Sequence, residues 1–185
     1  KDAVCDQLRE ATGTRPDVDT DRPHLWLSVH AAHDWVTVGV DLAGGSLHKR
    51  GYRVASVDAP MQETVAAAVV ELSGWDGARP LYDPMCGSGT LPVEAALMAT
   101  DSAPGLLRDY FGFFRWQQFD ERDWQPLREE AVQRQAEGLQ RKLPSIAGYD
   151  TDSRAIRSAW QHADLLGSPY PRPYQHEAFS VFRGN

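Results

Sequence analysis

Cysteine, long apolar runs and positive charge are all scarce in this sequence. Only two cysteines, Cys5 and Cys86, occur among 185 residues, which is too few for a disulfide framework and fits a reducing compartment. No apolar run approaches the roughly 18 residues of a membrane helix, and residues 1–5 lack the apolar region of a secretion signal. We therefore expect a cytoplasmic protein without a membrane partner.

The charge balance is negative, because 19 lysines and arginines face 26 aspartates and glutamates, a net charge of −7. Domains that grip nucleic acid are usually basic, so this balance argues mildly against RNA binding by the chain alone. One local basic stretch contains Lys49, Arg50 and Arg53. It can be a solvated segment, a contact to RNA phosphates, or an interface with the next domain. The six histidines lack metal-ligand spacing, so we predict no metal site.

The most informative stretch is a short apolar run, Leu81–Asp83, followed by a turn that contains Gly87, Ser88 and Gly89. An apolar helical segment begins directly after it. This order predicts a strand that ends in an acid, a tight turn and a helix. Ligands of open α/β sheets bind at the carboxyl ends of the strands, where such a turn lies, and glycines let the backbone approach a ligand closely.

Three common ligand-binding turns do not fit this stretch. A phosphate-binding P-loop needs a lysine, and Gly89 is followed by Thr90 and then leucine. A dinucleotide fingerprint needs a third glycine where Pro92 stands. A nucleophile elbow needs glycines two positions on either side of Ser88, where Cys86 and Thr90 stand. An acid followed by Gly-Ser-Gly instead suits a ligand with a sugar and an amino group.

A second strand ending in an acid is expected at 145–150. Asp152 then caps a helix that continues to Leu166. Two such units predict a doubly wound parallel sheet. Asp150 could accept both hydroxyls of a ribose, and Asp83 could orient an ammonium group. The alternative is that both acids only cap the ends of their strands.

Spacing and turn residues predict the other elements. The segment 101–144 is a charged insertion rich in aromatic residues, which we interpret as a packed cluster rather than a platform for stacking bases. The tail after residue 167 is rich in proline and ambiguous. Outside the two strand-turn-helix units, we expect helices over 2–12, 61–72 and 124–141 and strands over 25–30 and 35–41.

The turn and its surroundings resemble a known family. Asp-Pro-Met-Cys-Gly-Ser-Gly-Thr at 83–90, with Glu-Ala-Ala at 94–96, is similar to the first motif of class I S-adenosylmethionine-dependent methyltransferases. In particular it resembles the bacterial THUMP-containing 23S rRNA guanine-N2 methyltransferases. The resemblance extends over residues 1 to about 167. It is carried also by 46–53, by Ala59, Pro60 and Glu63, by 103–106 and 111–113, by Trp116 and Trp124, and by 148–152.

The resemblance implies a Rossmann-like α/β fold after the end of a THUMP-like domain, with domains at 1–57 and 58–185. It implies S-adenosylmethionine as cofactor and 23S rRNA as partner. With such a partner, we predict that the basic stretch with Lys49, Arg50 and Arg53 contacts RNA. Cys86 would be structural, since transfer to the exocyclic guanine nitrogen needs no cysteine nucleophile. The cofactor-binding positions carried over are Asp83, Cys86, Gly87, Ser88, Gly89, Thr90, Asp150 and, near the amino-acid end of the cofactor, Glu63.

The family's catalytic tetrapeptide, Asn-Pro-Pro-Tyr or a close variant, binds the target amine and stacks on the flipped base. It is not found here. Ser168-Pro169-Tyr170 resembles it only superficially, and Asn185 is the last residue. Catalytic residues therefore stay unassigned, and we expect half of a methyltransferase fold that is inactive alone or needs a partner. A non-catalytic RNA-binding or assembly module is the alternative, and an enzyme acting on DNA or tRNA is a third option.

Overall fold

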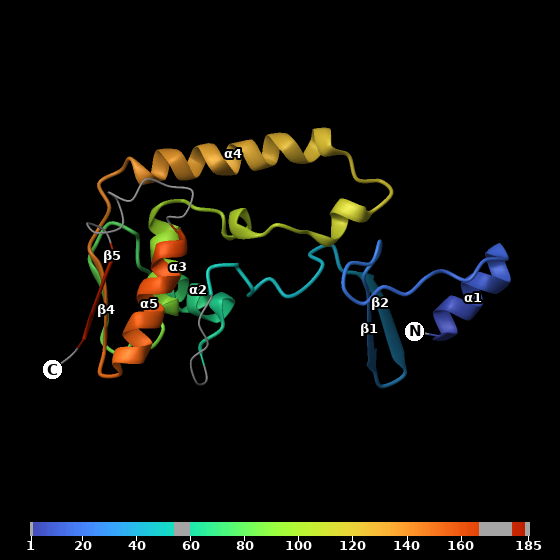
Figure 1. Cartoon of the computed structure of the whole chain (residues 1–185), viewed down its shortest axis with the longest axis horizontal. Coiled ribbons are helices and arrows are strands. Elements are labelled where there is room, and N and C mark those ends of the chain that lie inside the picture. Colours follow the sequence, from blue (N-terminus) through green and yellow to red (C-terminus); the bar gives the residue numbers. More distant parts are fainter. Residues whose placement is uncertain (1, 54–59, 167–178, 184–185) are drawn as a thin grey trace. The chain divides into compact units, whose positions relative to one another are not determined.

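The computed structural model describes residues 2–53, 60–166 and 179–183. The chain forms two compact units, which are considered separately (Figure 1). Unit 1 comprises Lys1–Gly45 and Tyr110–Phe119, and unit 2 comprises Ser46–Asp109 and Asp120–Asn185. In the described parts of the chain, no helix combines the length and the apolar character needed to cross a membrane.

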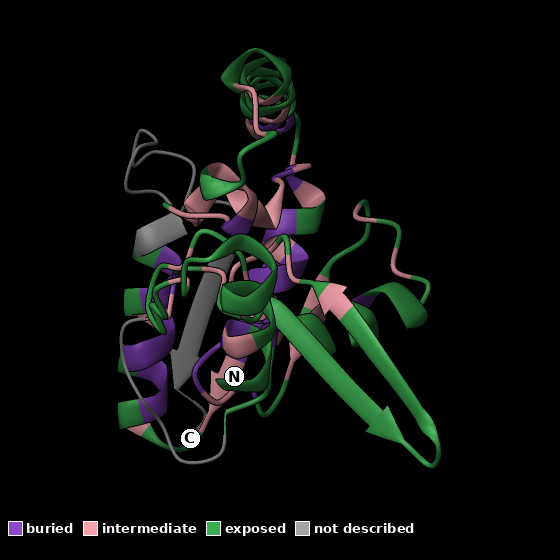
Figure 2. Cartoon of the chain, turned by 90° about the vertical axis from the view of Figure 1, so that its right-hand side faces the viewer, coloured by how far each residue is buried: buried purple, intermediate pink, exposed green. Residues whose placement is uncertain are grey.

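Unit 1 contains helix α1 (Asp2–Thr12) and a hairpin of strands β1 (Leu27–Ala32) and β2 (Trp35–Val40). The hairpin is antiparallel, and pairing continues to Ala32 opposite Trp35. The loop is therefore two residues long rather than the four expected, with His33 at a φ of 53°. Almost every hairpin residue is exposed (Figure 2).

The aromatic segment of unit 1 forms a packed cluster, as its composition predicts. The rings of Phe113 and Phe114 lie 5.0 Å apart in an edge-on arrangement, and each also packs against Phe119. The short helix η2 (Gly112–Arg115) ties this segment to the hairpin side of the unit, because the Phe113 N–H donates to the Leu42 carbonyl at 3.1 Å. Edge-on aromatic pairs contribute beyond their buried area.

Unit 2 is built on a parallel sheet with the strand order β3-β4-β5. Strand β3 (Leu81–Asp83) pairs with β4 (Ile146–Asp150), and β4 pairs with β5 (Phe179–Arg183). The first two strands confirm the sequence analysis, whereas β5 was not predicted. Parallel neighbours need a crossover between them, usually a helix, and α5 (Ser153–Leu166) connects β4 to β5.

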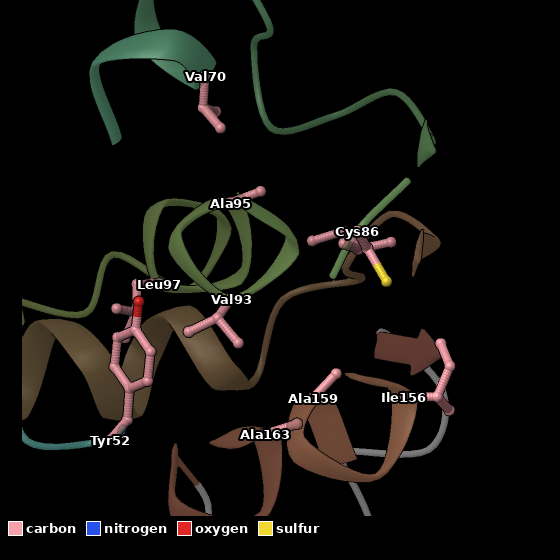
Figure 3. Close-up of a cluster of buried hydrophobic side chains, with 10 residues drawn as sticks. Tyr52, Val70, Cys86, Val93, Ala95, Leu97, Ile156, Ala159 and Ala163 are labelled. Atoms are coloured by element: carbon pink, nitrogen blue, oxygen red, sulfur yellow. The ribbon is translucent and has the colours of Figure 1, made fainter. Parts of the chain in front are cut away.

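Helix α3 (Thr90–Ala99) lies at the centre of the unit 2 core and contacts α2 (Glu63–Leu72), α5 and the first two strands. It is apolar on most of its surface, and Val93 and Ala95 have no exposed surface. Figure 3 shows Val93 directed toward the side of α5 that carries Ala159 and Ala163. Each large aliphatic side chain buried here contributes about 1.5–3 kcal/mol. This packing fixes the start of α3, where the glycine-containing turn lies.

The insertion ends in a long helix, α4 (Glu121–Leu139). It begins three residues earlier than expected because Asp120 caps it, accepting the Arg122 N–H at 2.9 Å. Arg134 forms two hydrogen bonds to Asp101, which fastens α4 beside the end of α3. The short helix η1 (Pro104–Leu107) also contacts α4.

Candidate functional site

The candidate site is built on the turn Cys86–Gly89, called here the Gly turn. The Gly89 N–H donates to the Cys86 carbonyl at 2.8 Å, and Gly87 and Gly89 have φ values of 54° and 78°. A Cβ at Gly89 would lie 2.9 Å from that of Ala159, whereas one at Gly87 would meet nothing within 4 Å. Gly89 therefore allows α5 to pack tightly, and the face of Gly87 is open.

The two predicted acids lie at the ends of adjacent parallel strands, β3 and β4. Asp150 accepts the Gly87 N–H at 2.9 Å and the Asp152 N–H at 2.8 Å, so one carboxylate joins the end of β4 to the Gly turn. Asp83 accepts the Met85 N–H at 3.1 Å. Both acids therefore do cap the ends of their strands by accepting backbone N–H groups. Each carboxylate keeps further lone pairs that a ligand could use.

This corner of the molecule is electronegative. Burial raises the pKa of Asp83 above its ordinary value, and the negative charge of Asp150 raises it further, against a lowering by the Met85 N–H. Two carboxylates that share a site disfavour each other's ionisation. A cationic or hydroxyl-bearing ligand would relieve that repulsion.

Cys86 is the first residue of the Gly turn, and it is buried. Burial, followed by the charges of Asp83 and Asp150, raises the pKa of the Cys86 thiol to about 12. Only the thiolate is a nucleophile, so this environment disfavours a nucleophilic role for Cys86. The Cys86 side chain lies against Gly148, where an added Cβ would be 2.9 Å from the sulfur.

Two arginines of the predicted RNA-contact patch are engaged with carboxylates. Arg53 donates to Glu63 at 3.0 Å and to the Thr90 hydroxyl at 3.2 Å, and its side chain is 21% exposed. Arg50 pairs with Glu94 at 3.4 Å and is 13% exposed. An RNA phosphate would have to compete with these pairs. RNA contact stays a prediction, and it fits the exposed Lys49 best.

Arg53 links Glu63 to Thr90, the residue that directly follows the Gly turn. The Glu63 side chain is 5% exposed, and the same guanidinium that pairs with it bonds Thr90, the first residue of α3. Thr90 and Ser88 are themselves buried. These side chains shape the turn from inside, and direct ligand contact by them is a separate prediction.

Three buried polar residues near the Gly turn were missed by sequence reasoning. The Tyr52 hydroxyl donates to Glu94 at 3.0 Å, and burial raises the pKa of both groups, opposed at Glu94 by Arg50. His162 on α5 is 1% exposed, with Nδ1 3.0 Å from the Ser88 carbonyl oxygen. A charged residue inside the apolar run of α3 and a histidine on the apolar face of α5 were the available signals.

Comparison with known proteins agrees with this arrangement. Residues 1–41 match the THUMP domain, and residues 50–175 match the family described as the RMKL-like methyltransferase domain. The chain belongs to the RMKL-like methyltransferase family. The expected domain boundary at 57/58 lies outside the described residues, as do Ser168–Tyr170 and Asn185.

Several relatives of this RMKL-like chain carry the name ribosomal RNA large subunit methyltransferase K/L. The protein from Syntrophotalea carbinolica is 50% identical over 171 residues, which are 90% of this chain and 24% of the relative. The protein from Methylococcus capsulatus is 48% identical over 171 residues, covering 90% and 23%. The chain thus spans about a quarter of the length of the curated relatives it matches.

Two solved structures share the fold of the RMKL-like chain. One is described as a predicted N6-adenine-specific DNA methylase from Listeria monocytogenes, with a TM-score of 0.80 and 35% identity, covering 100% of this chain and 46% of that one. The other, SMU.472 complexed with SAH, has a TM-score of 0.80 and 31% identity, covering 99% and 45%. The Rossmann-like fold after a THUMP domain is therefore confirmed, with the methyltransferase domain partial relative to these structures.

Proposed function

We propose that this chain holds the S-adenosylmethionine site of an enzyme that methylates ribosomal RNA. The observation that carries the proposal is the pair Asp83 and Asp150 at the ends of adjacent parallel strands, on either side of a turn whose Gly87 face is open. The relatives named for rRNA methylation and the neighbour bound to SAH support it. Acids alone do not define a ligand, but this sheet edge is where α/β folds bind nucleosides.

The residues of the site fit the parts of this cofactor. Asp150, at the end of β4, would accept the ribose hydroxyls while keeping its bond to the Gly87 N–H. Asp83 would face the ammonium group at the amino-acid end, and that positive charge favours the ionised form of Asp83. The open face of Gly87 lets the ligand approach the backbone. The bound cofactor supplies an electrophilic methyl group, and the chain positions it and excludes water.

The acceptor we propose is the exocyclic N2 of a guanine in 23S rRNA. The large-subunit name of the relatives supports an rRNA substrate, and the guanine nitrogen follows from the motif resemblance at 83–90. Such a substrate implies work in the bacterial cytoplasm. Lys49 would contact an RNA phosphate, and the residues that hold the target base stay unassigned.

Calorimetric titration of this chain with S-adenosylhomocysteine (SAH) tests cofactor binding. Wild-type chain should bind one equivalent, and Asp83→Asn and Asp150→Asn should each weaken binding about tenfold or more, because each loses one charge-assisted contact. Asp120→Asn is the matched control, since asparagine also caps a helix and α4 lies away from the acids. Absence of heat with wild-type chain would refute the proposal and favour the non-catalytic RNA-binding module.

A methyl-transfer assay tests whether the acceptor is the N2 of a guanine in 23S rRNA. The protein would be incubated with unmodified 23S rRNA and radiolabelled cofactor, and the rRNA then digested to nucleosides. The label should co-migrate with N2-methylguanosine. Label on adenosine would overturn the guanine assignment while leaving the cofactor site intact, and transfer to DNA or tRNA in preference to 23S rRNA would overturn the substrate class.

A further inference from the structure

A histidine buried in the core, His162, contacts the backbone of the Gly turn. His162 is 1% exposed, and its Nδ1 lies 3.0 Å from the Ser88 carbonyl oxygen. A carbonyl oxygen only accepts hydrogen bonds, so Nδ1 carries the proton and donates. On α5, His162 lies three residues after Ala159 and next to Ala163, which both belong to the core cluster shown in Figure 3. A Cβ added at Gly89 would lie 2.9 Å from that of Ala159.

The hydrogen bond acts on one particular peptide unit. The Ser88 carbonyl and the Gly89 N–H belong to the same peptide plane, and that N–H donates to the Cys86 carbonyl at 2.8 Å. Gly89 has a φ of 78° and is the N-cap of α3. Because glycine rotates freely, the backbone itself does little to hold this plane. The two hydrogen bonds therefore fix it from opposite ends.

The orientation of this peptide affects the position of Gly87, whose open face is the expected ligand side of the turn. Gly87, which bonds Asp150 at 2.9 Å, directly precedes Ser88. If the peptide after Ser88 rotated, the positions of Gly87 and of its N–H relative to Asp150 would change with it. A polar residue in a core face costs free energy unless it is hydrogen-bonded, and an apolar residue would fill the same space without that cost. The placement of His162 thus points to a role for its N–H.

We propose that His162 is a positioning residue for the cofactor: its Nδ1–H holds the Ser88–Gly89 peptide so that the Gly turn is preformed for binding. It acts through Ser88 and does not touch the ligand. This inference rests on the proposed function, because it assigns the turn to cofactor binding. Preorganisation of this kind improves affinity by avoiding the cost of ordering the turn.

Two variants of the same shape separate the hydrogen bond from packing. Asparagine carries an N–H donor close to where Nδ1 stands in histidine, and leucine has the same branched shape without a donor. His162→Asn should therefore bind SAH within about threefold of wild type, whereas His162→Leu should bind about tenfold more weakly, the loss of one net hydrogen bond. Equal SAH affinity in wild type and His162→Leu would overturn the proposal.

A stability control excludes a general effect of a damaged core. Val70→Ala on α2 removes two methyl groups from the same core cluster and should lower the melting temperature without changing SAH affinity at a temperature where the protein stays folded. If Val70→Ala weakens SAH binding as much as His162→Leu does, His162 is merely structural and the proposal fails.

Amide hydrogen exchange of the ligand-free protein gives a readout that does not depend on the cofactor. The Gly89 amide should exchange about tenfold faster in His162→Leu than in Val70→Ala and near the wild-type rate in His162→Asn. Unchanged Gly89 exchange in His162→Leu would overturn the positioning role. If wild-type chain fails to bind SAH, the proposed function is wrong, and this exchange measurement still decides whether His162 orders the turn.

Discussion

Asp83 is held in an environment that disfavours its charge. Burial raises the pKa of Asp83 above the ordinary value of 3.8, and Asp150 adds to the rise. The native state therefore binds the proton more tightly than the unfolded chain does. Stability is then lost as the pH rises through the raised pKa, the reverse of a salt-bridged carboxylate. A bound cation would offset this loss of stability by pairing with the ionised carboxylate. Carboxylates with perturbed pKa values are common at functional sites.

Asp83→Asn should consequently stabilise the ligand-free protein. The free energy of unfolding of the variant should exceed that of wild type near pH 7, and the difference should vanish below about pH 3, where both states of wild type are protonated. Asparagine can still accept the Met85 N–H. Urea unfolding across this range measures the effect, and a variant less stable than wild type at neutral pH would contradict it.

Substituting alanine for each of the two glycines of the Gly turn should affect SAH affinity and stability differently. Gly87→Ala forces a positive φ at about 1 kcal/mol but meets no atom, so it should reduce SAH affinity more than stability. Gly89→Ala brings a Cβ within 2.9 Å of Ala159 and should cost about 2–4 kcal/mol of stability. Urea denaturation and calorimetry on both variants decide this. If one of the two variants showed the larger loss of both stability and SAH affinity, the assignment of the Gly87 face as the ligand side would be contradicted.

The Cys86 thiol should resist alkylation while the protein is folded. Because the pKa of this thiol is raised to about 12, the thiolate fraction near pH 8 is below about one part in a thousand. Iodoacetamide labelling followed by mass spectrometry should therefore modify Cys86 only after denaturant is added. Rapid labelling of Cys86 in native protein would contradict the packed position.

At the scale of elements, Arg53 joins the start of α2 to the start of α3. Its guanidinium pairs with Glu63, the first residue of α2, and bonds Thr90, the first residue of α3. The ion pair of Arg53 and Glu63 is mostly buried, with side chains 21% and 5% exposed. Removing one partner leaves the other buried and unpaired, which costs more than the pair contributes.

Arg53→Met should therefore destabilise unit 2 by about 2–3 kcal/mol, a figure reduced from that of fully buried pairs because the side chain is partly exposed. Adding Glu63→Gln should recover about 1 kcal/mol or more, since no unpaired charge then remains. A double-mutant cycle by urea unfolding measures the coupling. Strictly additive losses would mean that the two side chains do not interact.

Elements with a clear period or a terminal signal could be predicted from the sequence. The strand-turn-helix unit around 81–99 and the acid at Asp150 followed from apolar runs and glycine positions. The strand β5 was missed because prolines precede it and its pairing depends on residues far away in the chain. The start of α4 was misplaced because the cap at Asp120 was overlooked. Local patterns also do not reveal that Arg53 turns inward, since a buried partner determines that.

At the scale of the whole molecule, the proposed ligand should act on unit 2 alone. SAH at about 100 times its dissociation constant should stabilise the bound state by about 2.7 kcal/mol. Hydrogen exchange should therefore slow at the Gly turn, in α3 and at the end of β4, while the β1–β2 hairpin of unit 1 keeps its rate. Equal protection of the hairpin would mean that the two units respond as one.

The hydrogen bond from the Gly87 N–H to the Asp150 carboxylate has a consequence for synthesis of the chain. It spans 63 positions, so the two halves of the site leave the ribosome separately. At about 5–20 residues per second, roughly 3–13 s pass between their emergence. During that interval the nascent Gly turn has neither its carboxylate partner nor α5 beneath it. A nascent chain stalled before residue 150 should consequently capture no cofactor, and the first capture would report that β3 and β4 have paired.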